Sequence, residues 1–483
     1  GARQVDPGED VLNRARIPTF GYPDTAARMF DYMWSYTYNL RGIYETPILP
    51  SDGEGAPDRG RAGKIIQAAR DSGRTLLTEF EAKQVLESYR IPVVETRIVE
   101  SVEQLRDAAT AIGLPVALKI LSPDISHKSD VGGVALDLET LEEVEAAGRA
   151  MLARVGRLRP DATIAGFTLQ PMVRRGGAHE LIVGATTDPA FGPVILFGQG
   201  GTAVEVIGDR AVALPPLNEF LAKDLIDSTR ASMILDQFHN MPPVDRAALK
   251  EVLLCISEMV CELPWIQEMD LNPLIVDENG AIAADARIVI DHAGGASGDR
   301  YAHMAIYPYP VHLIQEWPMN DGKIVTIRPI RPEDAEMEQE FVKGMSDESR
   351  YYRFMDTLRE LTQTMLVRFT QIDYDREMAL VATVPGAEGK EIQIGVARYV
   401  VNPDGESVEF ALAVGDDWQK CGVGRKLMTA LIDCARQKGY RAVVGDVLST
   451  NSKMFRLMTS LGFSIHPHPD DTAVKRVVKP LTV

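Results

Sequence analysis

Val408-Glu-Phe-Ala-Leu-Ala-Val414, followed by Gln419-Lys-Cys-Gly-Val-Gly-Arg425, decides the fold that we expect for the last third of the chain. The first segment alternates large apolar residues with others and predicts a half-buried strand. After the two glycines, apolar residues recur at helical spacing as far as Lys438, and Gly439 marks a helix end. The glycine loop therefore precedes a helix N-terminus, where unpaired backbone N–H groups and the helix dipole favour a pyrophosphate.

Glu409 lies on the predicted strand with Ala411 and Ala413 on its own face, which leaves room for a ligand beside a carboxylate. A lysine amine, with an ordinary pKa of about 10.4, must lose a proton before it can attack a thioester, and a carboxylate is a suitable base. The alternative for any single glutamate is a solvent-facing position on a half-buried strand.

The flanking sequence predicts a mixed α/β arrangement. We expect strands at 324–330, 378–384, 393–401 and 442–448, and helices at 333–345, 423–438 and 452–461.

The Gln-x-x-Gly-x-Gly loop, Ile327-Arg-Pro-Ile-Arg-Pro-Glu-Asp334, and Asn451 followed by Leu461-Gly-Phe463 together resemble the GCN5-related N-acetyltransferase (GNAT) family, over about residues 323–483. The resemblance implies acetyl-CoA as cosubstrate and Glu409 as catalytic base. It implies acetyl-CoA contacts at Ala411, Leu412, Ala413, Val414, Gln419, Lys420, Cys421, Gly422, Val423, Gly424, Arg425 and Asn451.

Two further features bear on this resemblance. The family often has a tyrosine that protonates the leaving thiolate, but the corresponding position here is Met458, which cannot donate a proton. Asp373-Tyr-Asp-Arg-Glu-Met-Ala379 resembles acetyltransferase domains fused to acyl-CoA synthetase-like regions, whose acceptor is a protein lysine. Taken singly, these charges are typical of a solvated turn.

The middle of the chain alternates helices and strands. Thr78 and Glu81 form a capping box for a helix at 79–89, and a strand at 116–121 contains Lys119. A buried strand lysine needs an anion, and the glycine pair Gly132-Gly133 that follows can surround phosphates. A surface lysine is the simpler alternative.

Together with Phe197-Gly-Gln-Gly-Gly201 and Asp270-Leu-Asn-Pro-Leu274, these features resemble the ATP-grasp subunit of ADP-forming acyl-CoA synthetases, over roughly residues 64–292. The resemblance implies ATP or ADP contacts at Lys119, Gly132, Gly133, Gln170, Pro171, Met172, Glu180, Gly200, Gly201 and Glu205. It implies Mg²⁺ ligands at Asn272 and Asp285, whose oxygens suit a hard cation, and a phosphoryl carrier at His127. A structural role is the alternative for this histidine.

We expect five segments: residues 1–50, which resemble the end of a CoA-ligase domain; a linker at 51–63; an ATP-grasp domain at 64–295; a linker at 296–322; and a GNAT domain at 323–483. The rest of the CoA-ligase domain, with its own phosphorylated histidine, is expected upstream of Gly1. The fold class is therefore multidomain α/β and α+β.

The net charge of −18 argues against a general nucleic-acid-binding protein. The C-terminal 161 residues hold 22 basic and 23 acidic residues, so the other 322 hold 29 and 46 and carry nearly all of this charge. No apolar run is long enough to span a membrane, and four cysteines form no disulfide pattern, so we expect a cytoplasmic protein.

The leading expectation is an acetyl-CoA-dependent protein lysine acetyltransferase with a nucleotide-binding ATP-grasp region, acting on protein lysines, with an acyl-CoA synthetase as one candidate acceptor. The alternatives are a fragment of an ADP-forming acyl-CoA ligase with a passenger transferase domain, and a nucleotide sensor that biases the transferase.

Overall fold

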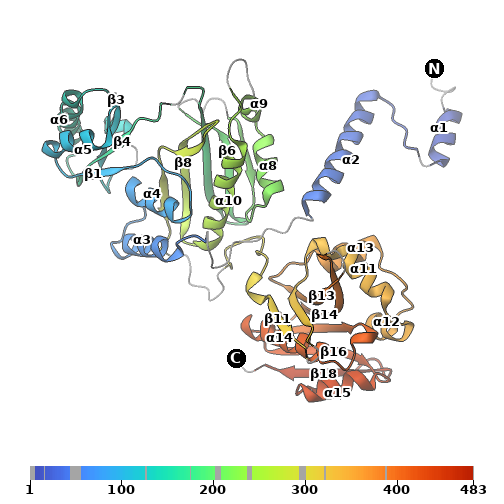
Figure 1. Ribbon diagram of the computed structural model, residues 1–483. Helices are drawn as coiled ribbons and strands as arrows, with labels where there is room; N and C mark the ends of the chain where they lie inside the picture. Colours follow the sequence, from blue (N-terminus) through green and yellow to red (C-terminus); the bar gives the residue numbers. More distant parts are fainter. Residues whose placement is uncertain are drawn as a thin grey trace.

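The computed structural model describes residues 6–15, 17–43, 56–125, 128–174, 176–201, 208–236, 242–292, 301–319, 322–386 and 389–481. Within these ranges the strands form three sheets of four, six and eight strands (Figure 1). The first two belong to the middle of the chain and the third to its last third.

Two helices precede the sheets, α1 (Asp6–Arg14) and α2 (Pro23–Ile43). Pro23 occupies the first position of α2, as expected from its fixed φ and missing N–H. Phe30, Tyr32, Met33 and Trp34 on this helix are exposed.

The four-stranded sheet has the order β1-β4-β2-β3, and α5 and α6 pack on it. Its central strand β2 is buried along its whole length, because strands pair on both edges and helices cover the sheet. The elements are β1 (Arg97–Val99), α5 (Leu105–Ile112), β2 (Val116–Leu121), β3 (Val134–Leu138), α6 (Leu141–Leu158) and β4 (Gly166–Pro171).

The six-stranded sheet has the order β10-β8-β5-β6-β7, with β9 paired to β8. A large apolar core joins it to the helices that flank it. The elements are α3 (Arg59–Asp71), α4 (Glu79–Ser88), β5 (His179–Asp188), β6 (Gly192–Gln199), β7 (Arg210–Ala213), α8 (Glu219–Asp227), α9 (Ser232–Leu235), α10 (Arg246–Glu262), β8 (Ile266–Asp277), β9 (Gly280–Ala283) and β10 (Arg287–Ile290).

The eight-stranded sheet has the order β11-β12-β13-β14-β15-β16-β18-β17, and β15–β16 is its parallel pair. The strands are β11 (Gln315–Pro318), β12 (Ile324–Pro329), β13 (Glu377–Pro385), β14 (Glu391–Val401), β15 (Ser407–Val414), β16 (Ala442–Leu448), β17 (Ser464–Pro467) and β18 (Val474–Pro480). The helices are α11 (Ala335–Gly344), α12 (Asp347–Phe354), α13 (Gln363–Thr370), α14 (Val423–Gln437) and α15 (Ser452–Ser460).

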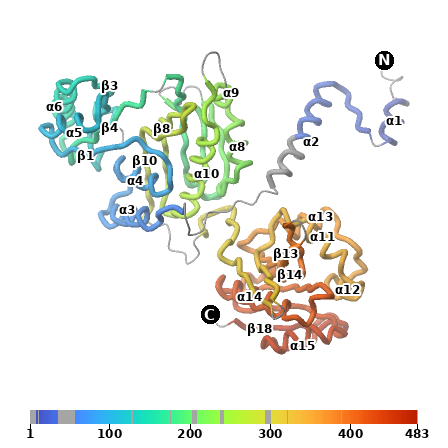
Figure 2. The backbone as a smooth tube through the Cα atoms, in the orientation of Figure 1, coloured from blue at the N-terminus to red at the C-terminus, as the bar shows by residue number. Residues whose placement is uncertain are grey.

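The two faces of this sheet carry different helices. Phe410 and Leu412 point into a core shared with α14, whereas Ala413 points into a core shared with α11 and α13. Figure 2 shows α11, α12 and α13 grouped together, away from α15. We call the side of Glu409, Ala411 and Ala413 the first face, and the side that carries α14 the second face.

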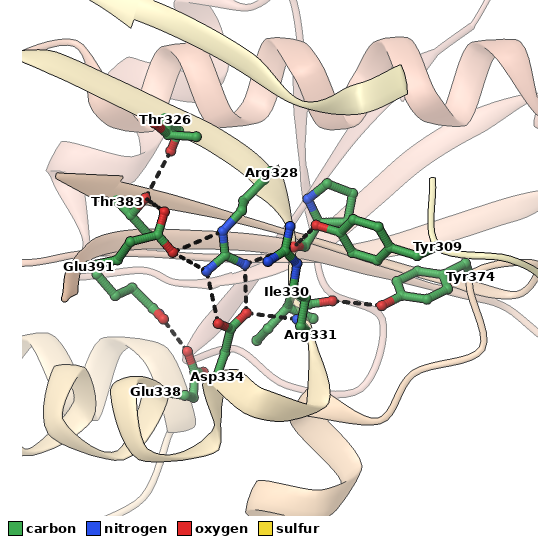
Figure 3. A network of polar contacts seen from close by, with 12 residues as sticks. Tyr309, Thr326, Arg328, Ile330, Arg331, Asp334, Glu338, Tyr374, Thr383 and Glu391 are labelled. Carbon is green, nitrogen blue, oxygen red and sulfur yellow. Dashed lines mark hydrogen bonds and ion pairs between the residues drawn. The ribbon is translucent and has the colours of Figure 1, made fainter. Parts of the chain in front are cut away.

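The motif at 327–334 joins the first strands of this sheet to α11. Arg328 is buried and donates two hydrogen bonds to Asp334, at 2.7 and 2.8 Å, and bonds Glu391 as well (Figure 3). Burial would lower the pKa of Arg328, but its bonds to the two carboxylates raise it. Asp334 also accepts the backbone N–H of Arg331 at 2.7 Å. The motif therefore has a structural role here.

Most of the expected elements are present within one or two residues. The capping box of Thr78 and Glu81 forms as predicted, and β2 and β16 have the predicted bounds. Two differences stand out. The expected linker at 51–63 overlaps α3, which begins at Arg59. The expected linker at 296–322 contains β11, which pairs with β12 through four residues and so belongs to the sheet.

Candidate active site

The parallel strands β15 and β16 pair only at their beginnings. The paired residues are Ser407 with Ala442, Val408 with Val443 and Glu409 with Val444. On its other edge β15 stays paired with β14 as far as Val414. Beyond Glu409, the edge of β15 that faces β16 is therefore free of ladder partners, and its backbone groups are available to a ligand.

A cavity of about 460 Å³ opens along this free edge, lined by Leu412, Ala413 and Val414. The loop that follows β15 forms its next wall. Gly422 has φ 93° and caps α14, a conformation that favours glycine, and a Cβ there would lie 3.3 Å from the Trp317 ring. The first N–H groups of α14 lack acceptors within the helix, as at any helix N-terminus, and so suit a pyrophosphate.

Four cationic side chains from this loop, α14 and α15 line the cavity: Lys420, Arg425, Lys453 and Arg456. Lys453 donates to the side-chain oxygen of Gln419 at 3.1 Å, and Arg425 donates to Ser460. Within the described ranges none of the four forms an ion pair. The pyrophosphate and 3′-phosphate of CoA together carry about four negative charges, which these groups can balance.

The opposite wall comes from the end of α11 and from α12. Ser349 of α12 donates to Asp416 at 2.6 Å, and the amide of Gln419 donates to Ser349 at 3.3 Å, so the helix is held against the loop. This wall consists of Met345, Glu348, Ser349, Tyr352 and Arg353. The sequence did not indicate it, because no local motif marks residues that reach the cavity only through tertiary packing.

Nine of the twelve residues expected to contact acetyl-CoA line this cavity. They are Leu412, Ala413, Val414, Gln419, Lys420, Gly422, Gly424, Arg425 and Asn451. Three do not: Ala411, Cys421 and Val423. The side chain of Val423 is buried in the core, because α14 turns it toward the sheet, and Cys421 is exposed.

Asn451 has a second task, since its side-chain oxygen accepts the Met454 N–H at 3.0 Å and caps α15. Met458 is buried in the core of the second face. Its position is consistent with a packing role.

Glu409 is exposed and lines a second, smaller cavity of about 290 Å³. The other charged residues of this cavity are Asp404, Asp446 and Arg476. Arg476 pairs with both carboxylate oxygens of Asp446 at 2.9 Å, and the Asp404 carboxylate accepts a backbone hydrogen bond within the turn before β15. Glu409 is thus a carboxylate at the point where β15 and β16 separate.

The middle of the chain contains a buried charge cluster around Glu79. Lys119 lies 2.7 Å and Lys128 2.6 Å from its carboxylate oxygens, and Lys83 lies 3.2 Å away. Lys119 also contacts Asp285 at 3.2 Å. Burial alone would raise the pKa of Glu79, but the three lysines hold it well below its usual range. Burial lowers the pKa of Lys83 to about 8.

The sequence indicated Lys119 but missed its partners Glu79, Lys83 and Lys128. Gln170 belongs to the same cluster, because its side-chain oxygen accepts from Lys83 at 2.7 Å. The spacing of Glu79 and Lys83, one helical turn apart, was the available signal. Three lysines against two carboxylates leave a surplus positive charge that suits a phosphate.

Among the other expected nucleotide contacts, Gly200 and Gly201 lie beside the expected residues Glu180 and Asn272, whereas Met172 and Gly133 have separate hydrogen-bond partners. The N–H of Gly201 donates to the side-chain oxygen of Asn272 at 3.1 Å, and the N–H of Gly200 donates to the Glu180 carbonyl at 2.8 Å. Met172, next to Pro171, is held by its N–H on the Pro115 carbonyl at 2.9 Å. Gly132 adopts φ 62°, and the N–H of its neighbour Gly133 bonds the Lys128 carbonyl at 2.7 Å. His127 and Glu205 lie outside the described residues.

The expected metal ligands Asn272 and Asp285 are neighbours across the β8–β9 hairpin, where the Ala284 N–H donates to the Pro273 carbonyl at 3.0 Å. Two hard oxygen donors fit a Mg²⁺ ion that is shared with nucleotide phosphates. In the described part of the chain, no group of three or more His, Cys, Asp or Glu side chains is arranged to hold a metal by itself.

Among the described helices, none has the length and apolar character that crossing a membrane requires.

Comparison with protein families matches residues 68–290 to the ATP-grasp domain and residues 325–464 to the acetyltransferase (GNAT) domain. These matches confirm the fold class: an ATP-grasp-like domain followed by a GNAT domain with a mixed sheet.

Among curated proteins, the β subunit of ADP-forming acetate–CoA ligase II of Pyrococcus furiosus is 39% identical over 235 residues, which cover 48% of this chain and 99% of that subunit. An acetyltransferase of Pseudomonas aeruginosa is 35% identical over 154 residues, 32% of this chain and 82% of that protein. The ADP-forming acetate–CoA ligase I of Archaeoglobus fulgidus is 36% identical over 290 residues, 60% of this chain, and the match spans 41% of that ligase.

Proposed function

Because this chain belongs to the family of ADP-forming acetate–CoA ligase β subunits through its ATP-grasp domain, and to the GNAT acetyltransferases through its C-terminal domain, we propose that it transfers an acetyl group from acetyl-CoA to protein lysines. The ATP-grasp domain then serves as a nucleotide-binding regulatory region.

One observation carries the proposal: the free edge of β15 and the N-terminus of α14 line one cavity with four cations that have no ion-pair partner in the described structure. An extended thioester arm can bond the strand edge, while its phosphates reach the helix N-terminus and the cations. A glycine loop that served only as a turn would not need this surplus of positive charge.

Glu409 supports an amine acceptor. In the proposed reaction Glu409 accepts the proton of the lysine ammonium, directly or through water, and the amine attacks the thioester carbon. The oxyanion bonds backbone N–H groups of the free strand edge. The C–N bond forms and the C–S bond breaks. The second proton of the amine nitrogen passes to water, and water protonates the departing CoA thiolate, since Met458 cannot supply a proton.

The test uses the full chain, acetyl-CoA and a lysine-containing peptide, with release of free CoA measured by a thiol reagent. The matched control is the same peptide with its lysine replaced by arginine. We expect release that depends on the lysine. Equal release with both peptides, or none above the rate without protein, would disprove lysine acetylation.

A second candidate function is supported by the match over 99% of a ligase β subunit. The ATP-grasp domain would bind ATP or ADP through the Lys119 cluster and Gly200–Gly201, with Mg²⁺ on Asn272 and Asp285 neutralising phosphate charge. Formation of acyl-CoA would further require the CoA-ligase part of such enzymes. Calorimetric titration with Mg-ADP tests nucleotide binding, and Lys119→Met should abolish it.

A further inference from the structure

Arg353 is a cation of the main cavity that lies apart from the other four. It lines the cavity from α12 and is partly buried, whereas Lys420, Arg425, Lys453 and Arg456 come from the loop, α14 and α15. Within the described residues it forms no hydrogen bond or ion pair. The neighbouring acidic side chain of that wall, Glu348, is exposed and forms no ion pair with it.

The guanidinium of Arg353 is held in place by aromatic rings. It lies 5.0 Å from the ring centroid of Phe354 and 5.9 Å from that of Phe369, and the two rings are stacked. Such contacts fix the direction of the guanidinium but do not use its five N–H donors. Arg353 can therefore donate hydrogen bonds to a ligand without rearrangement.

Arg353 also shares its surroundings with a second buried arginine. Arg398 lies 4.4 Å from the Phe369 ring centroid and 3.6 Å from Glu338, whose carboxylate also accepts from Gln393. Burial, together with the positive charge of Arg398, lowers the pKa of Arg353 to about 10. Arg398 has the Glu338 carboxylate as its ion-pair partner, whereas Arg353 forms no ion pair within the described residues, so its guanidinium can bind an anionic group of a ligand.

The position of Arg353 indicates which end of a bound acyl-CoA it meets. Arg398 is the cross-strand partner of Ala411, which lies on the first face with Glu409. The four other cations belong to the end of the cavity near α14 and α15, where the phosphates are expected. Arg353 therefore lies toward the acyl end of the thioester.

The carboxylate that Arg353 meets must belong either to the acyl donor or to the acceptor. Glu409, the base expected to face the acceptor amine, lines the second cavity. Arg353 lines the cavity of the donor. This separation favours the donor.

We propose that Arg353 is a specificity-determining residue that binds a terminal carboxylate on the acyl chain, so that the enzyme accepts dicarboxylic acyl-CoA donors as well as acetyl-CoA. This inference rests on the proposed acyltransferase function and names its donor class. The guanidinium fork matches a carboxylate in a bidentate geometry that lysine does not reproduce.

The experiment compares acetyl-CoA with succinyl-CoA as donors to the same lysine peptide, using the full chain and its Arg353→Gln, Arg353→Lys and Arg425→Gln variants. We expect the wild type to use succinyl-CoA, and Arg353→Gln to lower the succinyl-to-acetyl ratio of kcat/KM about 10- to 100-fold. Arg353→Lys should recover part of the ratio. Arg425→Gln, at the phosphate end, should lower kcat/KM for both donors by the same factor.

Two results would overturn the inference and leave the proposed function intact. One is a succinyl-to-acetyl ratio that is unchanged in Arg353→Gln. The other is a wild type that transfers acetyl groups but does not use succinyl-CoA. If neither acyl group is transferred, the proposed function fails, and the inference is then tested by binding. Calorimetry gives the Kd of succinyl-CoA and of acetyl-CoA for the wild type and for Arg353→Gln. The inference requires that Arg353→Gln raise the Kd of succinyl-CoA more than that of acetyl-CoA, and an equal change in both would contradict the inference. Urea unfolding verifies that each variant is folded.

Discussion

Glu409 and Val444 form the last residue pair of the parallel ladder between β15 and β16. The side chain of Glu409 thus stands where the two strands begin to separate, beside the opening that exposes the edge of Leu412 to Val414. Glu409 lines the smaller cavity, and the free strand edge beyond it, from Leu412 to Val414, lines the larger one.

Replacing Glu409 with glutamine should remove the base and keep the shape of the site. We expect kcat for transfer to a lysine peptide to fall about 10²- to 10⁴-fold at neutral pH, with little change in the Kd for acetyl-CoA. Glu406→Gln is the matched control, because Glu406 is exposed and pairs with Arg441 at the surface. Normal turnover in the Glu409 variant would exclude it from the mechanism.

Acetyl-CoA binding should depend on salt. Because Lys420, Arg425, Lys453 and Arg456 are expected to balance the phosphates, the Kd measured by calorimetry should rise as NaCl is increased. The double variant Lys420→Gln/Arg456→Gln should bind more weakly and respond less to salt. Arg149→Gln, an exposed position on α6, is the control. If the Kd of the double variant depended on salt as steeply as that of Arg149→Gln, these cations would not be the ones that bind the phosphates.

Much of the fold of the GNAT domain could be predicted because the sequence patterns that indicate it are local. The glycine loop, the helix after it and the alternation along β15 are each contained within a few residues, and the structure has all three. Val423 illustrates the limit of such reasoning: it belongs to the loop motif, yet the helical turn directs its side chain into the core. The motif identified the segment correctly but not the direction of each side chain.

The parts that escaped prediction depend on distant contacts. Arg353 reaches the cavity only because α12 packs against the loop at Asp416, and nothing near it in sequence marks that contact. The lysines around Glu79 come from α4, β2 and the turn after β2, so their convergence on one carboxylate requires the tertiary fold. The four-residue β11 is too short to show an alternating pattern.

Removal of the buried carboxylate at Asp334 should destabilise the GNAT domain. Asp334→Ala leaves the buried Arg328 with a single carboxylate partner, and we expect a loss of about 3 kcal/mol in the free energy of unfolding, measured in urea. Asp433→Ala breaks an exposed pair with Arg436 and should cost less than about 1 kcal/mol. If the two variants lost the same free energy of unfolding, the motif at 327–334 would have no buried structural role.

The Glu79 cluster should make stability depend on pH. The pKa of Glu79 is lower in the folded chain than its ordinary value of 4.5, so its contribution is complete above that pH and is lost as the pH falls toward the lowered value. Thermal unfolding between about pH 6 and pH 3 should therefore show a steeper loss in the wild type than in Glu79→Gln. Glu87→Gln, an exposed position, should keep the wild-type slope.

The most direct measurement is mass spectrometry of a lysine peptide after incubation with the full chain and isotope-labelled acetyl-CoA. We predict that the label appears on the lysine side-chain amine, at a rate that matches CoA release and that falls in Glu409→Gln. CoA release without labelled peptide, or label that appears equally without the protein, would contradict the account.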